Sequence, residues 1–234
     1  IILRKIYLKI IMKDLTLIIP SKRESESLPI FLKELKKYKC KKKIVLQKND
    51  FKTINSLKKF KEVEIFKQKK LGYGNAIIEG INSTKSKYFC IINADGSMDP
   101  KYLNKMLKLC KKLDLVFASR YVKLGGGSED DTFVTFVGNK IFSFLGNFLF
   151  DLNISDILFT YILANTKSVK SLNLKSKDFR LCVELPIKAK KSGLRYKCIS
   201  SFERSRIGGF KKVNAIKDGF LILTSIISLF LGKK

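Results

Sequence analysis

Short apolar runs alternate with segments of helical spacing along the first half of this chain, and this alternation restricts the fold more than any other feature. The apolar runs are 15–19, 44–46, 63–66, 88–92 and 115–118, and the segments between them are 28–38, 53–60, 72–83 and 100–113. Strands that alternate with helices form βαβ units, in which neighbouring strands are parallel and helices cover the sheet. The pattern therefore predicts an α/β fold with a mixed, mostly parallel sheet flanked by helices.

The pattern changes after Arg120. The later elements that we expect are an acidic Gly-rich loop at 124–131, an apolar helix or helix pair at 133–150, a strand at 154–164, a helix at 182–192 and a strand at 194–202. These elements divide the chain into an N-terminal extension at 1–13, one folded domain at 14–213 and a C-terminal amphipathic, apolar helix at 214–234. No segment reaches the roughly 20 apolar residues that span a bilayer, so we expect no spanning helix.

The charge of the chain favours an anionic partner. There are 48 Lys and Arg residues against 20 Asp and Glu, a formal net charge of +28. Phospholipid headgroups, phosphorylated substrates and nucleic acids all fit such a surface. An AT-rich genome would produce the same Lys excess without selection for binding. No RNA-binding signature occurs, and the aromatic residues cluster with aliphatic ones, so we expect no nucleic acid partner.

The missing residue types restrict the chemistry. The chain has no His, which excludes His general bases, Ser–His nucleophile pairs and His-ligated zinc. Carboxylates, amines, hydroxyls or a metal held by oxygen must do the work. The five Cys residues show no C-x-x-C pairing, which is typical of reduced thiols in a cytosolic protein.

One acidic turn follows a buried strand. Residues 93–100 read Asn-Ala-Asp-Gly-Ser-Met-Asp-Pro and come directly after the apolar run 88–92. In open α/β sheets, ligands bind at the carboxyl ends of the strands. A carboxylate at Asp95 can hold a hard cation such as Mg²⁺ or Mn²⁺, which in turn holds a diphosphate. The alternative is a plain Asp/Gly turn before a helix that Asp99 and Pro100 open.

Five segments in this order resemble the inverting GT-A glycosyltransferases of family 2. The similarity is greatest to the dolichol-phosphate mannose synthase branch and its bacterial polyprenyl-phosphate relatives, and it runs from Leu15 to Gly219. The segments are 17–24 (LIIPSKRE), 71–76 (LGYGNA), 93–100 (NADGSMDP), 119–127 (SRY and the Gly run) and 206–214 (RIGGFKKVN). The resemblance implies a Rossmann-like GT-A fold and a hexosyltransferase of the dolichyl-phosphate mannosyltransferase type.

The resemblance also implies roles for individual residues. The residues matched to donor nucleotide binding are Pro20, Glu24, Gln47, Gly72, Gly74, Asn93 and Asp95. Those matched to binding of the acceptor phosphate are Arg120, Arg206 and Lys212. Asp95, Asn93 and Ser97 match the site of a divalent cation, Mg²⁺ or Mn²⁺. Asp95 and Arg206 are the expected catalytic residues.

Three positions depart from the family pattern. Gln47 stands where the family has Asp near the nucleotide, Asn93 replaces the first Asp of the metal motif, and Ser97 replaces a frequent Gln. Asp95 is then the single carboxylate in the core of that motif. A catalytically degenerate, non-enzymatic homologue is therefore an open alternative, and the nucleotide base is not defined.

The expected reaction suits a chain without His. A polyprenyl phosphate of the dolichyl or undecaprenyl type is already an anion, so it can attack the anomeric carbon of a nucleotide-diphosphate sugar without a general base. Such a transfer serves the synthesis of cell-envelope glycans. If the acceptor is instead a sugar hydroxyl, a carboxylate base is needed, and Asp130 or Asp131 is the candidate.

A lipid acceptor implies a membrane-associated protein. Basic residues attract anionic headgroups, and we expect a cytoplasmic protein that lies peripherally on the cytoplasmic face of the membrane. The candidate lipid dock is Phe142, Phe144, Leu145, Phe148 and Leu149, for which a buried core helix is the alternative. The tail at 220–231 either packs on the domain or lies in the membrane interface.

Overall fold

The computed structural model describes residues 10–122, 124–209 and 212–232. The strands are β1 Ile10–Ser21, β2 Tyr38–Leu46, β3 Glu64–Lys67, β4 Tyr88–Ile91, β5 Leu115–Ser119, β6 Gly127–Ser128, β7 Ile162–Asn165, β8 Tyr196–Ser200 and β9 Phe202–Glu203. The helices are α1 Ser27–Leu35, α2 Phe51–Ser56, α3 Tyr73–Asn82, the 3-10 turn η1 Pro100–Tyr102, α4 Leu103–Cys110, α5 Phe133–Phe150, α6 Thr166–Lys170, α7 Leu181–Lys191 and α8 Ala215–Phe230.

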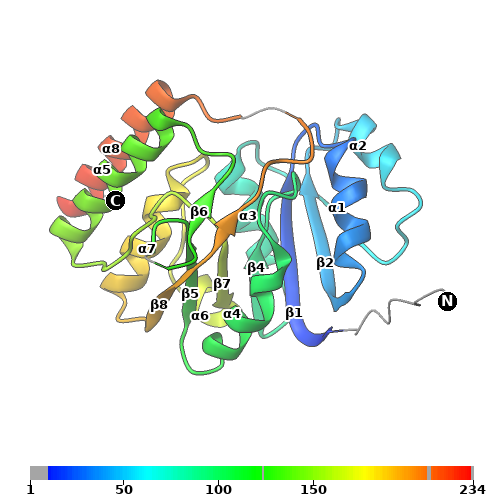
Figure 1. Cartoon of the computed structure of the whole chain (residues 1–234), viewed down its shortest axis with the longest axis horizontal. Helices are drawn as coiled ribbons and strands as arrows, with labels where there is room; N and C mark the ends of the chain where they lie inside the picture. The colour runs from blue at the N-terminus through cyan, green and yellow to red at the C-terminus, as the bar shows by residue number, and fades with distance from the viewer. Residues whose placement is uncertain (1–9, 123, 210–211, 233–234) are drawn as a thin grey trace.

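Within the described part of the chain, a seven-stranded sheet forms the centre of the molecule (Figure 1). Its strand order is β3-β2-β1-β4-β7-β5-β8. Strand β7 runs antiparallel to both of its neighbours, and the other pairings are parallel. Strands β6 and β9 form a separate parallel pair. The predicted α/β fold with a mixed, mostly parallel sheet is confirmed.

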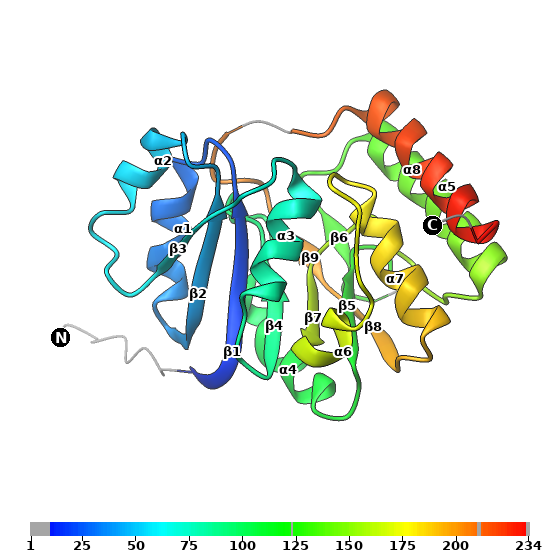
Figure 2. The same cartoon turned by 180° about the vertical axis from the view of Figure 1, so that it is seen from behind.

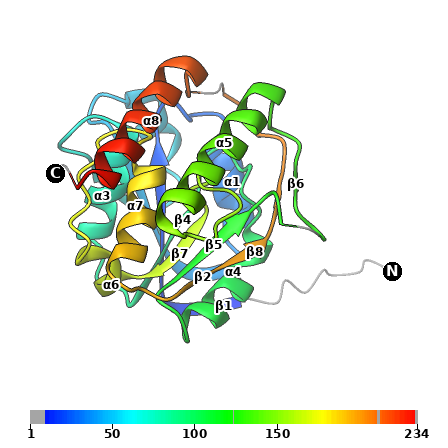
Figure 3. The ribbon, with the colours of Figure 1, turned by 90° about the vertical axis from the view of Figure 1, so that its left-hand side faces the viewer.

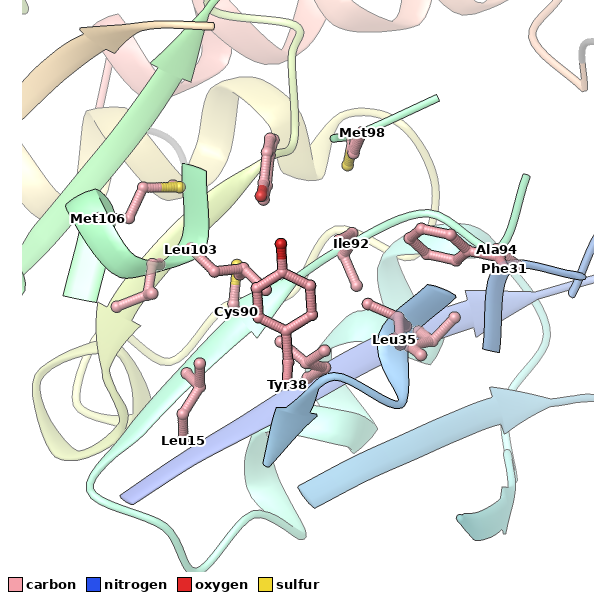
Figure 4. Packing of buried hydrophobic residues seen from close by; sticks show 14 of the residues in the cluster. Leu15, Phe31, Leu35, Tyr38, Cys90, Ile92, Ala94, Met98, Leu103 and Met106 are labelled. Carbon is pink, nitrogen blue, oxygen red and sulfur yellow. The ribbon is translucent and has the colours of Figure 1, made fainter. Parts of the chain in front are cut away.

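One face of the sheet is covered by α1, α2 and α4. In α1, Leu28, Phe31, Leu32 and Leu35 share one helical face and are buried, as helical periodicity requires, whereas Ile30 on another face is 52% exposed. Figure 4 shows this cluster, in which Phe31 and Leu35 of α1 and Leu103 and Met106 of α4 pack over Leu15 and Cys90 of the strands. This packing fixes the strand ends that border the pocket described below.

The other face is covered by α3, α6 and α7, which Figure 2 shows from behind. Ala76, Ile77 and Ile81 of α3 pack against Ile18 and Val45 of the sheet. Helix α7 is buried along most of its length. Outside it, α5 and α8 lie side by side and form the outermost layer at one end of the molecule (Figure 3).

Three boundaries differ most from the prediction. Strand β1 begins at Ile10, within the predicted extension 1–13, and pairs there with β2; residues 1–9 lie outside the described residues. Strand β2 begins at Tyr38, at the end of the segment 28–38 predicted as helical, and not at residue 44. The predicted strand at 154–164 is wrong for 154–161, because β7 starts only at Ile162. The preceding residues form a loop that directs Asp156 and Thr160 into polar contacts, and side-chain bonding of this kind competes with strand pairing.

Helix α5 corrects the expectation that no segment is long and apolar enough to cross a membrane. It has 18 residues and a mean hydropathy of 1.3, and 17% of it is buried in the protein. By length and composition alone it passes the test for a spanning helix. Helix α8, predicted as the apolar helix of 214–234, begins at Ala215 and ends at Phe230.

Replacement of glycine by alanine should have opposite effects on stability at two helical positions, Gly80 of α3 and Gly138 of α5. A Cβ at Gly80 would lie 2.6 Å from Ile18 Cγ2 and 3.2 Å from Val45 Cγ2, whereas one at Gly138 would meet nothing within 4 Å. We expect Gly80→Ala to lower the free energy of unfolding by about 1–3 kcal/mol through overpacking. We expect Gly138→Ala to raise it by about 0.5–1 kcal/mol. Urea unfolding followed by circular dichroism measures both, and equal stabilities of the two variants would contradict the packing of α3 on β1.

Candidate active site

A pocket of about 470 Å³ opens at the carboxyl ends of the parallel strands. Ser21 ends β1, Gln47 follows β2, Gln68 follows β3 and Arg120 follows β5, and all four residues line it. Most of the predicted site residues also lie in its wall, namely Pro20, Glu24, Gln47, Gly72, Asn93, Asp95, Ser97, Arg120, Arg206 and Lys212. The remaining one, Gly74, is not part of the lining. The structure therefore brings together residues that are up to 192 positions apart, from Pro20 to Lys212.

Asp95 is fixed in its turn by Ser97. Its Oδ1 accepts hydrogen bonds from Ser97 N at 3.1 Å and from Ser97 Oγ at 2.9 Å. Its Oδ2 lies 3.9 Å from Arg206 Nη1. Gly96, at a φ of +77°, supplies the left-handed backbone that the turn needs. The turn therefore presents one oxygen of the carboxylate to the arginine side of the pocket.

The amide of Asn93 is also held in place. Its Oδ1 accepts a hydrogen bond from Tyr73 Oη at 3.2 Å, and the same hydroxyl lies 2.6 Å from Thr160 Oγ1. Tyr73 stacks on Phe179 with ring centroids 4.8 Å apart. The sequence analysis did not identify Tyr73 as part of the site, although it lies between the two glycines of the matched motif.

The donor set around Asp95 fits a divalent cation only together with a ligand. Among the residues that the structure describes, no group of three or more His, Cys, Asp or Glu side chains could hold a metal ion. Mg²⁺ is often bound through one or two carboxylates, with substrate phosphates and water completing its shell. Asp95 and the amide oxygen of Asn93 match that arrangement, so a cation would be held jointly with a diphosphate.

Arg206 and Lys212 reach the pocket already paired with carboxylates. Arg206 Nε and Nη2 donate to the two oxygens of Asp130 at 3.0 and 2.6 Å. The hydrogen bonds from Arg206 to Asp130 raise the pKa of the arginine above its ordinary value. Lys212 donates to Glu24, a carboxylate that also accepts a hydrogen bond from Ser27 Oγ at 2.5 Å. A phosphate that binds either cation must share it with these carboxylates or replace them.

Arg120 is committed to a buried network. Its Nε and Nη2 donate to Asp156 Oδ2 and Oδ1 at 2.8 and 2.9 Å, and its Nη1 donates to Glu203 Oε2 at 3.0 Å. Asp156, which is 1% exposed, also accepts from Asn139 of α5. Burial alone would lower the pKa of Arg120, but the bonds to Asp156 and the nearby charges raise it. The phosphate-binding role of Arg120 stays a prediction, and this pairing makes a structural role the stronger interpretation.

The glycines Gly72 and Gly74 are explained by protein contacts. A Cβ at Gly72 would lie 2.1 Å from Lys177 O, and one at Gly74 would lie 2.1 Å from Ser176 O. The start of α3 therefore packs against the backbone of the 175–178 loop. The resemblance matched both glycines to donor nucleotide binding, whereas in the structure the closest neighbours of a Cβ at either position are backbone oxygens of this loop.

The two candidate base residues differ in their surroundings. Burial tends to raise the pKa of Asp131, but hydrogen bonds from Thr135 and Tyr121 hold it below its ordinary value. Asp130 is engaged by Arg206. Glu203, which the sequence analysis missed, lines the same pocket, and burial raises its pKa above the usual range. The available signal for Glu203 was an acidic residue directly after the predicted strand 194–202.

The pocket and sheet agree with the comparisons with known proteins. Residues 16–172 match the model of Glycosyl transferase family 2. The chain therefore belongs to glycosyltransferase family 2, and the GT-A fold and the expectation of a glycosyltransferase are confirmed.

The solved structures that the chain resembles share this fold. Glucosyl-3-phosphoglycerate synthase from Mycobacterium tuberculosis, in complex with Mn²⁺, uridine diphosphate and phosphoglyceric acid, has a TM-score of 0.68 and 11% identity over 92% of this chain and 78% of that chain. Mannosyl-3-phosphoglycerate synthase from Rubrobacter xylanophilus has a TM-score of 0.67 and 14% identity over 94% of this chain and 74% of that chain. Both structures are phosphoglycerate synthases, so neither supports the polyprenyl-phosphate branch of the family in particular.

The buried network predicts a large stability effect. Asp156→Ala would leave the guanidinium of Arg120 without its bidentate partner, and breaking a buried pair in this way costs about 3–5 kcal/mol. Because Glu203 still contacts Arg120, we expect the lower end of that range in urea unfolding. Lys190→Ala is the control, since it removes an ion pair with Asp151 whose side chains are 39% and 92% exposed, and it should cost less than about 1 kcal/mol. Equal losses in the two variants would contradict the network.

The turn at Asp95 predicts metal-dependent donor binding. Asp95→Asn keeps the shape of the side chain but removes its charge, so nucleotide-sugar affinity measured by calorimetry with Mn²⁺ should fall at least about tenfold, or 1.4 kcal/mol. Asn93→Asp adds a carboxylate beside Asp95 and should increase the Mn²⁺-dependent part of the nucleotide-sugar affinity. Asp14→Asn, at an exposed position in β1 outside the pocket lining, is the control. An affinity in Asp95→Asn that is unchanged and insensitive to chelator would disprove the metal assignment.

Proposed function

We propose that this protein is an inverting glycosyltransferase that moves a hexose from a nucleotide-diphosphate sugar to a polyprenyl phosphate at the membrane surface. The observation that supports this proposal best is the set of residues that line the pocket. The wall contains Asp95, Arg206 and Lys212, and it also contains Thr135 of α5 and Ile222 of α8. A polar, cationic donor side that adjoins two apolar helices fits an acceptor with a phosphate head and a hydrocarbon tail.

The reaction follows from this arrangement. An oxygen of the acceptor phosphate attacks the anomeric carbon, and the bond from that carbon to the diphosphate oxygen breaks. The nucleoside diphosphate leaves with the bonding electrons, and the configuration inverts. A bound divalent cation supplies Lewis acidity at the diphosphate. Arg206 offers a planar fork for two phosphate oxygens and stabilises the negative charge that develops on the leaving group.

Lys212 and Glu24 complete the proposed donor side. Glu24 is 6% exposed and Lys212 donates to it, so the pair sets the position of the segment that follows Arg206. Gln47 and Gln68 line the region beyond the ends of β2 and β3. Their amides offer donors and acceptors to a nucleotide base. The peripheral position on the cytoplasmic face of the membrane belongs to the same proposal.

A phosphorylated hydroxyl acceptor is the second candidate. It is favoured by the solved phosphoglycerate synthases that the chain resembles. That reaction needs a carboxylate to take the hydroxyl proton, and Glu203, with its raised pKa, is better suited than Asp131.

Transfer assays separate the two candidates. We expect the purified protein to move labelled hexose from one of the UDP-, GDP- or dTDP-sugars to a prenyl phosphate in the presence of Mn²⁺, and not to phosphoglycerate. Arg206→Lys keeps the charge but loses the planar fork, and it should lower prenyl-phosphate transfer at least about tenfold, or 1.4 kcal/mol in the barrier. Arg195→Lys, at a side chain that is 74% exposed and pairs with Asp114, should leave transfer unchanged.

Two outcomes would reject the proposal. Transfer to phosphoglycerate alone, abolished by Glu203→Gln, would establish the hydroxyl acceptor. Wild-type transfer by Arg206→Lys would show that the acceptor and leaving group do not depend on the arginine fork.

A further inference from the structure

Helix α5 is amphipathic in the reverse sense for a protein surrounded by water. The residues that it buries are Asn139, Ser143 and Gly146, which are polar or small. The residues that it exposes include Phe133 at 81%, Phe144 at 65% and Phe148 at 75%. A surface helix of a soluble domain turns its apolar face to the core and its polar face outward. Helix α5 departs from this rule, because its fully buried residues are polar or small, whereas its apolar Phe142, Leu149 and Phe150 are only partly buried against the core.

The protein body imposes this orientation. Asn139 donates to the buried Asp156, and its Oδ1 accepts from Ser143 Oγ at 3.1 Å. Ser143 Oγ in turn accepts from the backbone N–H of Ile157 at 3.1 Å. Rotating α5 to bury its phenylalanines would break these bonds and leave the buried carboxylate of Asp156 with fewer partners. The apolar face therefore stays outward.

Helix α8 extends the same exposed apolar surface. It packs beside α5 and α7 (Figure 3) and buries Ile222 and Ile226. Its exposed apolar side chains include Ile216 at 87% and Phe220 at 67%. The outer face of α5 and α8 thus gathers exposed apolar side chains on two adjacent helices, whereas single scattered ones are normal on monomers.

The charges of these helices fit anionic headgroups. Helix α5 contains no acidic residue, and its one charged side chain is Lys140, whose Nζ lies 4.5 Å from the ring centre of Tyr121 and 5.5 Å from that of Phe136. A lysine beside aromatic rings at the edge of an apolar face can direct its ammonium to the headgroup layer while its stem stays in hydrocarbon. On α8, Lys217 is exposed and stands next to Asp218, the one acidic residue of that helix.

We propose that the outer face of α5 and α8 is inserted into one leaflet of a lipid bilayer, with both helices in the plane of the membrane. Helix α5 does not cross the bilayer, because its polar face is bonded along the protein body. Thr135 and Asn139 of α5 and Ile222 of α8 line the pocket, so insertion brings the pocket to the level of the headgroups. This proposal deepens the proposed function and rests on it only for the identity of the acceptor.

Flotation with lipid vesicles tests the insertion. The full chain should float with vesicles of phosphatidylcholine and phosphatidylglycerol at 0.5 M NaCl, because insertion of apolar side chains is not screened by salt. Phe133→Glu combined with Ile141→Glu, at side chains of α5 that are 81% and 52% exposed and lie outside the candidate lipid dock, should reduce the bound fraction at least tenfold. Phe51→Glu is the matched control, since Phe51 is 66% exposed on α2, away from this face, and it should bind like wild type.

Three results would overturn the proposal. These are flotation of wild type at low salt only, flotation of the double variant at the wild-type level, and a lipid-free dimer by light scattering that the double variant converts to monomer. The last would show that a second copy covers the face.

Activity separates this proposal from the previous one. We expect the double variant to keep wild-type transfer to a short, water-soluble prenyl phosphate while it loses transfer to a long-chain acceptor in vesicles. If no prenyl phosphate is an acceptor, the proposed function fails, but the flotation result still decides the insertion.

Discussion

The buried pair between Arg120 and Asp156 is the interaction on which the rest of the structure depends. Asp156 receives the backbone N–H and the guanidinium of Arg120, at the end of β5, together with the amide of Asn139 on α5. A buried carboxylate must be paired in this way because an unpaired one is very costly in a low-dielectric interior. One side chain therefore fixes the loop before β7, the end of β5 and the rotation of α5.

The orientation of α5 has consequences on both of its sides. Inward, its polar residues complete the pocket and leave no room there for phenylalanine. Outward, the apolar residues have no protein to cover them among the residues that the structure describes. The polar network and the exposed apolar face are thus one arrangement, and the membrane proposal follows from the same bonds that build the pocket.

The pocket carries its counterions before any ligand binds. Arg206 is held by Asp130, and Lys212 by Glu24, so the cations lie in fixed positions without being left buried and unpaired. An incoming diphosphate or phosphate can replace one of these carboxylates as the partner of the cation. The net charge around that cation then changes little. Preorganised cations of this kind stabilise charge that develops in a reaction without reorganising at that moment.

The local spacing of apolar residues accounts for most of the helices and strands that were predicted from the sequence. The strands through β5, helix α5 and helix α7 were placed from spacing alone, because burial of one helical or strand face leaves a periodic trace in the residues themselves. Asp95 at the end of β4 followed from the rule that ligands bind at the carboxyl ends of parallel strands, whereas Pro20, Glu24 and Gln47 followed from the resemblance to the family. Residues whose partners are distant, such as Glu203 and Tyr73, left no comparable trace.

The sequence by itself determined the fold class, the family and the position of Asp95 at a strand end. Only the tertiary structure decided which partner each charge takes, that Gly72 and Gly74 admit a backbone loop, and that Phe133, Phe144 and Phe148 of α5 are exposed. The periodicity of α5 shows that it is apolar but not which side is buried. That choice is made by Asp156, whose charge must be neutralised by side chains from other segments of the chain.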